Sequence, residues 1–154
     1  MIEGVRILPL RVSEDERGWF YELRRDSVLP KETRQTNISF SRQGVIRGLH
    51  YHERGQDDLF ACLRGTARVV VLARTTGETF TADIGEENPV AIYIPGIHAH
   101  GFEALTDLLF CYHVTEEYDP AEPDEHGLCW NDPRVSHLWH TTTPILSERD
   151  AAAC

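Results

Sequence analysis

Two pairs of closely spaced histidines are the residues of this sequence best suited to chemistry. His50 and His52 follow the segment 47–49, and His98 and His100 follow a proline–glycine turn at 95–96. Residues two apart on a β-strand project to the same face, so each pair can point into one cavity. Near neutral pH an imidazole serves as a general acid or base, or as a metal ligand. The pattern predicts a catalytic or metal-binding cavity where two strand ends meet.

The elements around these histidines are predicted to be β-strands. Short runs rich in Val, Ile, Phe, Tyr and Thr alternate with turn signals, and no long segment has helical periodicity. The predicted strands are 5–10, 19–23, 37–40, 59–63, 67–73, 79–84, 91–94 and 108–115. This pattern predicts an all-β sandwich or jelly-roll barrel, and 154 residues fit one domain over 1–154. Residues 118–133 are predicted to form a loop or short helical turn, and 151–154 a frayed end.

The composition argues against several classes of partner. A formal charge of −10 with dispersed arginines excludes a typical nucleic-acid-binding protein. There is neither a basic apolar leader nor an uncharged run long enough to cross a membrane, so we expect no membrane association and a cytoplasmic location. Cys62, Cys111, Cys129 and Cys154 lack paired spacing, so reduced and mostly buried thiols are expected. Lys31 is the single lysine, which leaves one candidate for a mechanism that needs one.

An ordered set of segments carries a resemblance to a known family. The segments are DERGWFYE at 15–22, QTNIS at 35–39, GVIRGLHY at 44–51, AHGF at 99–102, Tyr112 with YDP at 118–120, EHG at 125–127, WNDP at 130–133 and LSERD at 146–150. Together they span nearly the whole chain and resemble the dTDP-4-dehydrorhamnose 3,5-epimerase family, whose fold is a dimeric cupin jelly roll. The resemblance implies a homodimer of single cupin domains that acts on a dTDP-sugar substrate without a cofactor.

The same resemblance implies roles for individual residues. His50 matches the family's base, Asp150 the carboxylate that orients this base, and Tyr112 the acid on the opposite face of the sugar. The positions that line the pocket and hold the nucleotide, pyrophosphate or sugar are matched by Arg17, Phe20, Glu22, Gln35, Asn37, Arg47, His100, Tyr118 and Glu125. In that family the N-terminal strands reach across the dimer, so the first three of these residues are expected to serve the partner's site.

Elementary chemistry connects these residue types with epimerisation. In a 4-keto-6-deoxy sugar the protons on C3 and C5 both lie alpha to the ketone, so a base can remove them to give an enolate. A carboxylate fixes the histidine tautomer and stabilises the imidazolium, while inversion needs a separate acid on the other face. Arginines offer paired donors to a pyrophosphate, and Phe20 or Trp19 can stack on a nucleotide base. We therefore expect inversion of C3, C5 or both in a dTDP-linked 4-keto-6-deoxyhexose.

One position departs from the family pattern. The family usually carries a lysine at the start of the strand predicted at 59–63, where it is thought to help stabilise the enolate, and Asp58 occupies that position here. An aspartate cannot supply positive charge, so another donor is needed, with Arg68, His52 or a bound cation as candidates. Lys31 precedes the segment 35–39 and is not an obvious replacement. His52 also stands where the family commonly has glutamine.

These departures leave three alternatives open. His50, His52, an acid at Asp57 or Asp58, and His100 resemble the ligand set of metal-binding cupins, which hold Fe, Mn, Ni or Zn. A sugar-nucleotide 3,4-ketoisomerase uses a related cupin scaffold and the same substrate class. A cupin that binds a sugar nucleotide without catalysis is the third alternative. The epimerase explains the ordered set of segments better than any of the three.

Overall fold

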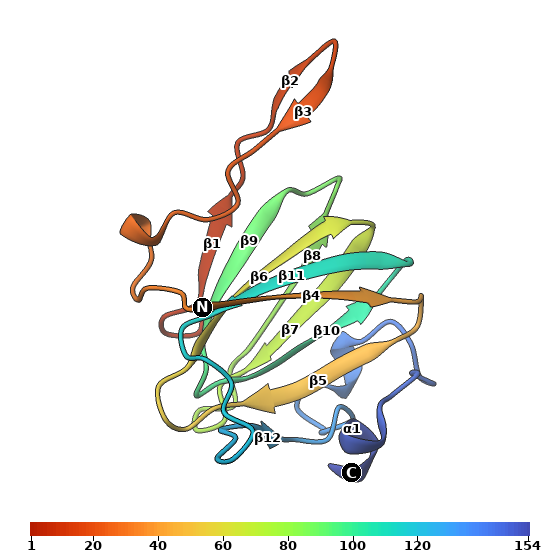
Figure 1. Cartoon of the computed structure of the whole chain (residues 1–154). Coiled ribbons are helices and arrows are strands. Elements are labelled where there is room, and N and C mark those ends of the chain that lie inside the picture. The colour runs from red at the N-terminus through yellow and green to blue at the C-terminus, as the bar shows by residue number, and fades with distance from the viewer.

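Two five-stranded antiparallel sheets face each other in the computed structural model, which describes residues 1–154 (Figure 1). The first sheet has the strand order β1 (Arg6–Pro9), β9 (Val90–Pro95), β6 (Asp57–Arg64), β11 (Leu108–Val114) and β4 (Gln35–Ser41). The second has the order β12 (His126–Gly127), β5 (Ile46–Tyr51), β10 (Ala99–Ala104), β7 (Thr66–Leu72) and β8 (Thr79–Gly85). This sandwich confirms the predicted all-β fold.

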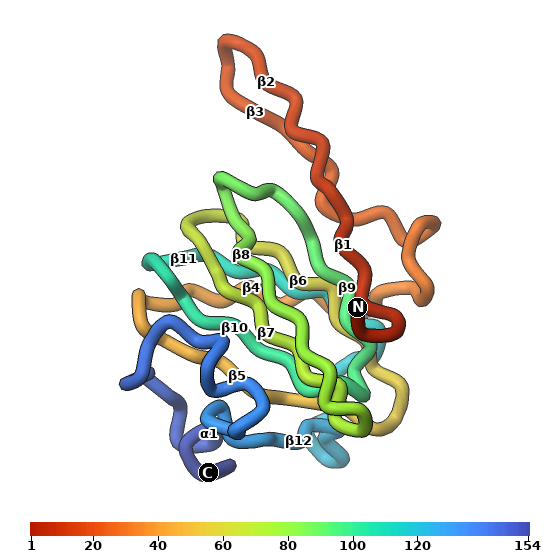
Figure 2. Tube along the Cα trace, turned by 180° about the vertical axis from the view of Figure 1, so that it is seen from behind, coloured from red at the N-terminus to blue at the C-terminus, as the bar shows by residue number.

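The remaining elements are short. β2 (Ser13–Asp15) and β3 (Gly18–Phe20) form a hairpin that projects from one end of the sandwich (Figures 1 and 2). Single turns of 3-10 helix occur at η1 (Asp26–Val28) and η2 (Ser136–Leu138), and the chain ends in the α-helix α1 (Glu148–Ala152). None of these helices has the length and apolar character that a membrane crossing requires. The predicted loop at 118–133 is confirmed apart from the two residues of β12.

The inner faces of the two sheets meet in an aromatic core. The rings of Phe102 and Phe110 stack with their centroids 3.9 Å apart, and Phe60 meets Phe110 edge-on at 5.1 Å. Val69 and Val71 of β7 are completely buried beside them. Aromatic pairs of this kind contribute about 0.5–1.5 kcal/mol each beyond the area that they bury. Because these rings belong to β6, β10 and β11, the core fixes the middle of three strands that also carry cavity residues.

The two ends of the chain cover the outer faces of the sheets. On the first sheet, buried Leu59 and Tyr93 pack under leucines of the N-terminal segment 8–29. On the second sheet, Leu49 and Val70 belong to one cluster with Trp139 from the C-terminal segment. β6 is covered on both faces, and its first six residues are accordingly all buried, including the two acids Asp57 and Asp58 at its start.

Two central strands lie outside the predicted runs. β5 and β10 are neighbours in the second sheet, and each carries histidine and glycine, which are weak strand formers. The glycines allow the two strands to approach closely: a Cβ on Gly48 would lie 2.9 Å from the Gly101 Cα, and one on Gly101 would lie 2.4 Å from the Arg47 carbonyl oxygen. Tertiary packing therefore overrides local propensity at the strands that hold both His50 and His100.

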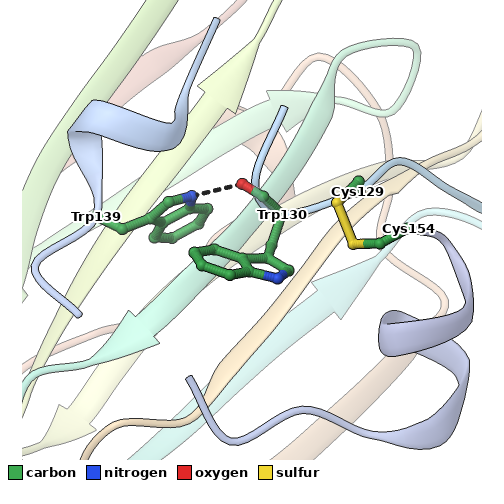
Figure 3. The surroundings of a disulfide bond; sticks show 4 residues. All are labelled: Cys129, Trp130, Trp139 and Cys154. Carbon is green, nitrogen blue, oxygen red and sulfur yellow. Dashed lines mark hydrogen bonds between the residues drawn. A yellow bond between two sulfur atoms is a disulfide. The ribbon is translucent and has the colours of Figure 1, made fainter. Parts of the chain in front are cut away.

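The C-terminus is ordered, and the expectation of a frayed end with reduced thiols is wrong there. Cys129 and Cys154 form a disulfide that ties the end of α1 to the loop after β12 (Figure 3). Beside it, the Trp139 indole N–H donates to the Trp130 carbonyl oxygen at 2.8 Å. A separation of 25 residues gives no local spacing signal, so this pair became visible only in three dimensions. The expectation of buried free thiols is confirmed for the other two cysteines, at 62 and 111.

Candidate active site

A cavity of about 860 Å³ opens between the two sheets. Strands β4, β6 and β11 supply one wall, β5 and β10 supply the other, and the C-terminal segment 145–150 closes one side. Strand register sets residues opposite one another, with His50 beside His100 and Tyr112 beside Asn37. The residues proposed from the sequence that line this cavity are Gln35, Asn37, Arg47, His50, His52, His100, Tyr112, Tyr118, Glu125 and Asp150.

His50 and Asp150 form a hydrogen-bonded dyad on one wall. The Nε2 atom of His50 lies 2.7 Å from one carboxylate oxygen of Asp150, and the other oxygen accepts from the Gly48 amide at 3.1 Å. Burial acts to raise the pKa of the Asp150 carboxyl, but the bonds from His50 and Gly48 outweigh burial and hold the pKa below its usual value. An ionised carboxylate accepts the Nε2 proton, so Nδ1 is the ring nitrogen with a free lone pair. The arrangement suits a general base.

The helix α1 positions the carboxylate of this dyad. Ser147 caps the helix, because its Oγ accepts a hydrogen bond from the Asp150 amide at 3.1 Å. Arg149 pairs with Glu125 at the rim of the cavity. These contacts bring Asp150 next to His50 although 100 residues separate the two in the chain.

Tyr112 lies on the other sheet, so a ligand between the sheets has the tyrosine on one side and His50 on the other. Burial raises the pKa of the Tyr112 phenol above its usual value, and the carboxylates of Asp58 and Glu125 raise it further. The phenol is therefore protonated at neutral pH. It can deliver a proton to the face of a sugar opposite the histidine base.

Asp58 is buried in the cavity wall between two histidines. Its carboxylate oxygens lie 3.4 Å from His100 Nε2 and 3.7 Å from His52 Nε2, and one of them accepts from the Gln56 amide nitrogen at 3.0 Å. Burial acts to raise the pKa of Asp58 and to lower that of His100. The hydrogen bond and the attraction between the two groups outweigh burial, so the pKa of Asp58 is lowered and that of His100 is raised. Burial lowers the pKa of His52. The three side chains thus form one coupled cluster.

Polar side chains on β4 and β5 give the cavity its other binding groups. Gln35 donates from Nε2 to Asn37 Oδ1 at 2.9 Å and accepts from the Tyr118 amide at 2.8 Å. Arg47 is exposed, and its Nε donates to Ser41 Oγ at 2.9 Å. Its planar group remains accessible and suits an anionic oxygen.

Comparison with known proteins identifies the family. The family model for dTDP-4-dehydrorhamnose 3,5-epimerase matches residues 1–154. The chain belongs to this family. The spore coat polysaccharide biosynthesis protein SpsL of Bacillus subtilis is 40% identical, with 92% of this chain and 98% of that protein covered. The dTDP-4-dehydrorhamnose 3,5-epimerase of Escherichia coli is 37% identical, with 97% and 88% covered.

Solved epimerases have the same fold. The crystal structure of the 3,5-epimerase RmlC from Legionella pneumophila, in complex with dTDP-4-keto-L-rhamnose, matches with a TM-score of 0.88 at 31% identity, covering 99% of this chain and 87% of that one. The predicted cupin jelly roll is confirmed by this similarity. Members of this epimerase family are isomerases.

The structure also bears on the metal-binding alternative, in which His50, His52, Asp57 and His100 would hold one ion. His50 is bonded to Asp150 and does not join His52 and His100. Asp57 lies away from the cavity, where its carboxylate accepts from the Tyr93 hydroxyl at 2.7 Å and from a backbone amide. The four-residue set His50, His52, Asp57 and His100 is therefore not assembled, and Asp58 takes the place expected for the acid.

Three predicted binding residues lie outside the cavity of their own chain. Arg17 and Phe20 belong to the projecting β2–β3 hairpin and Glu22 follows it. Arg17 pairs with Asp15, and Glu22 pairs with Arg25 at 2.7 Å. Phe20 is 67% exposed. Within one chain, these three side chains therefore do not reach the cavity.

Sequence reasoning also missed or misjudged several groups. Gln56 and Arg149 line the cavity but were not proposed, although Arg149 stands inside the segment 146–150 that carried the resemblance. Arg68, one candidate for the missing positive charge, pairs with Asp83 at 2.8 Å. Lys31, which the sequence already disfavoured for this role, pairs with Asp57 at 3.1 Å. Neither of them lines the cavity.

Proposed function

We propose that this chain epimerises a dTDP-linked 4-keto-6-deoxyhexose at C3, C5 or both, as one step of deoxysugar biosynthesis. The observation that carries the proposal is the His50–Asp150 dyad on one wall of the cavity with Tyr112 on the other. Nδ1 of His50 removes a proton alpha to the 4-ketone, and Asp150 stabilises the imidazolium that forms. The electron pair moves to the C4 oxygen, and Tyr112 protonates the carbon from the opposite face.

Proton exchange tests this proposal directly. The purified protein is incubated with dTDP-4-keto-6-deoxyglucose in deuterated water, and NMR records which carbons gain deuterium. We expect uptake at C3, at C5 or at both, and no uptake at either carbon refutes the epimerase for this substrate. A product in which the ketone has moved to C3 would indicate the ketoisomerase instead.

A pair of variants assigns the base. His50→Ala is expected to abolish exchange, because no other group bonded to Asp150 can accept the proton. His137→Gln is the matched control, since His137 is exposed and does not line the cavity. Exchange that survives in His50→Ala would show that another residue is the base.

We propose a homodimer as the functional unit. The hairpin β2–β3 extends beyond the sandwich and exposes Trp19 and Phe20, and β4 exposes Ile38 and Phe40 at the edge of the first sheet. Exposed apolar groups of this size are typical of interfaces. Docking of the hairpin on a second copy would bring Arg17, Phe20 and Glu22 to the partner's cavity. Light scattering checks the mass, and a monomer with full activity contradicts the proposal.

We also propose a cytoplasmic location, in keeping with a nucleotide-sugar substrate. The Cys129–Cys154 bond is the feature that opposes it, because disulfides are rare in the reducing cytosol. Rapid alkylation of intact cells followed by mass spectrometry of the protein reports the state of the two thiols. Complete protection of the disulfide in cells would speak for an oxidising compartment.

A further inference from the structure

We propose that His52, Asp58 and His100 form a binding site for a divalent transition-metal ion in the cavity wall. One ligand atom from each residue lies within 4.8 Å of the other two. The distances from Asp58 are 3.4 Å to His100 Nε2 and 3.7 Å to His52 Nε2. Metal–ligand bonds of about 2.0–2.2 Å place neighbouring ligand atoms about 3–3.6 Å apart. Small side-chain rotations therefore suffice to close the three donors around one ion.

Hydrogen bonds behind the two imidazoles orient them as ligands. Nδ1 of His100 contacts the His98 carbonyl oxygen at 2.8 Å, and Nδ1 of His52 contacts the Asp124 carbonyl oxygen. A carbonyl oxygen only accepts, so both Nδ1 atoms carry a proton, and Nε2, on the side of Asp58, is the ring nitrogen that a metal ion would bind. Metal-binding histidines almost always have this type of partner on their second nitrogen.

A neighbouring amide agrees with this tautomer. The Gln56 side-chain nitrogen lies 3.1 Å from His52 Nε2 and 3.0 Å from Asp58 Oδ1, so it donates to both. Both atoms are therefore acceptors facing a common point. Rotation of this amide would present its oxygen to the same point as a further donor.

The charge of the site favours a cation. His52, Asp58 and His100 are all buried, and a buried carboxylate is costly unless a positive group pairs with it. The partners of the Asp58 carboxylate in the cavity wall are the two imidazoles themselves, and Arg68, the arginine considered for this role, is paired with Asp83. Two imidazoles and one carboxylate form the donor set preferred by Fe(II), Mn(II), Ni(II) and Zn(II), and this triad leaves coordination positions open.

The site has a catalytic role that rests on the proposed function. The family resemblance implies one positive charge, on a lysine, at the position of Asp58. A divalent ion bound to one carboxylate restores a net charge of +1 at this place. As His50 takes the proton, the electron pair of the C–H bond moves to the C4 oxygen, where the cation stabilises the enolate. No oxidant or reductant is needed.

Metal binding is tested without reference to activity. The full-length, untagged protein is stripped with a chelator and titrated by calorimetry with Zn²⁺, with Mn²⁺, and anaerobically with Fe²⁺, and bound metal is counted by plasma mass spectrometry. We expect one ion of at least one of these metals per chain. His52→Gln and Asp58→Asn are expected to lose this binding, while His137→Gln, which removes an exposed histidine, retains it. Absence of stoichiometric binding, or unchanged binding in Asp58→Asn, overturns the proposal.

Spectroscopy on the unaltered protein covers the case of a variant that fails to fold. X-ray absorption of the zinc-loaded protein is expected to show two histidine nitrogens and carboxylate oxygen in the coordination shell. A shell that contains sulfur, or only water oxygen, contradicts the site.

Deuterium exchange separates the role of the metal from the proposed function. Removal of the ion is expected to slow exchange about 10²–10³-fold, the typical loss when a group that stabilises an oxyanion is removed. Full exchange without metal refutes the catalytic role and leaves the epimerase intact. Stoichiometric binding with no exchange in any form upholds the site and refutes the epimerase. Asp58→Lys is expected to lose the metal and still exchange, because it restores the lysine of the family.

Discussion

Loss of the Cys129–Cys154 disulfide is expected to lower the stability of the protein by a measurable amount. The bond spans 25 residues, and closing a loop of this length removes chain entropy from the unfolded state equivalent to about 3.5 kcal/mol at 25 °C. For a chain of this size, each kcal/mol corresponds to about 2–4 °C in Tm. The double variant Cys129→Ser/Cys154→Ser should therefore unfold about 7–14 °C below the oxidised wild type.

Loss of the disulfide should also affect the active site, because α1 carries Asp150. A helix of five residues is too short to be stable by itself, so its position depends on tertiary contacts. Without the disulfide, those contacts are the Asp150 bonds to His50 and Gly48 and the pairing of Arg149 with Glu125. A helix that detaches part of the time leaves His50 without its carboxylate. We expect a lower kcat with a smaller change in KM.

Calorimetry with and without a phosphine reductant checks both effects, with exchange activity measured on the same samples. The double serine variant is the control, since it should be insensitive to the reductant. Equal Tm values, within about 1 °C, for the oxidised and reduced wild type would refute the reasoning, because the entropy of loop closure would then have no counterpart in stability.

Three further predictions concern single groups. Asp150→Asn is expected to lower kcat about 10²–10⁴-fold, because the amide no longer fixes the His50 tautomer. The folded-state pKa of Asp150 is lowered, so its stabilising effect is present above about pH 3.9 and is lost as pH falls through the folded value. The Tm difference between wild type and Asp150→Asn should therefore narrow as pH falls below about 3.9, and a difference that stays constant down to about pH 2 would contradict the hydrogen-bonded carboxylate. Tyr112→Phe should reduce inversion more than deuterium uptake, since His50 can return a proton to the face from which it came; equal losses measured by NMR would show that the tyrosine is not the acid. Burial raises the pKa of Cys62 to about 11 and also raises that of Cys111, so neither thiol should react with iodoacetamide at pH 8 until the protein is unfolded. Labelling of the native protein by mass spectrometry would contradict their burial.

The sequence predicts the fold class and most strands because buried strands are recognisable as short runs of β-branched and aromatic residues. The runs at 67–73 and 79–84 are rich in β-branched residues, and both are strands. β5 and β10 give no such signal, since Gly48 and Gly101 serve the close approach of two strands and the histidines serve the cavity. The elements that position the site are thus the ones that local propensity describes least well.

The site shows the same division between local and tertiary information. The choice between Asp57 and Asp58 as cavity acid depends on strand phase, because neighbouring residues of a strand point to opposite faces. Asp57 faces outwards to Tyr93 and Asp58 faces inwards to His100. A phase error of one residue exchanges these roles, and no feature of the sequence around β6 fixes the phase, since six consecutive residues there are buried.

The charge of the proposed substrate bears on the proposed dimer. The protein carries a formal charge of −10, yet the proposed substrate contains a pyrophosphate. Two arginines line the cavity, and Arg149 is largely neutralised by Glu125, which leaves Arg47 as the accessible guanidinium. A single exposed guanidinium is a weak holder of a doubly charged anion in an acidic protein. Arg17 lies on the projecting hairpin outside the cavity of its own chain and pairs there with Asp15. If the hairpin docks on a second copy, Arg17 would be a further guanidinium at that cavity, where the pyrophosphate would compete with Asp15. The proposed dimer and the proposed substrate are therefore linked, because Arg17 could reach the pyrophosphate only from a neighbouring chain.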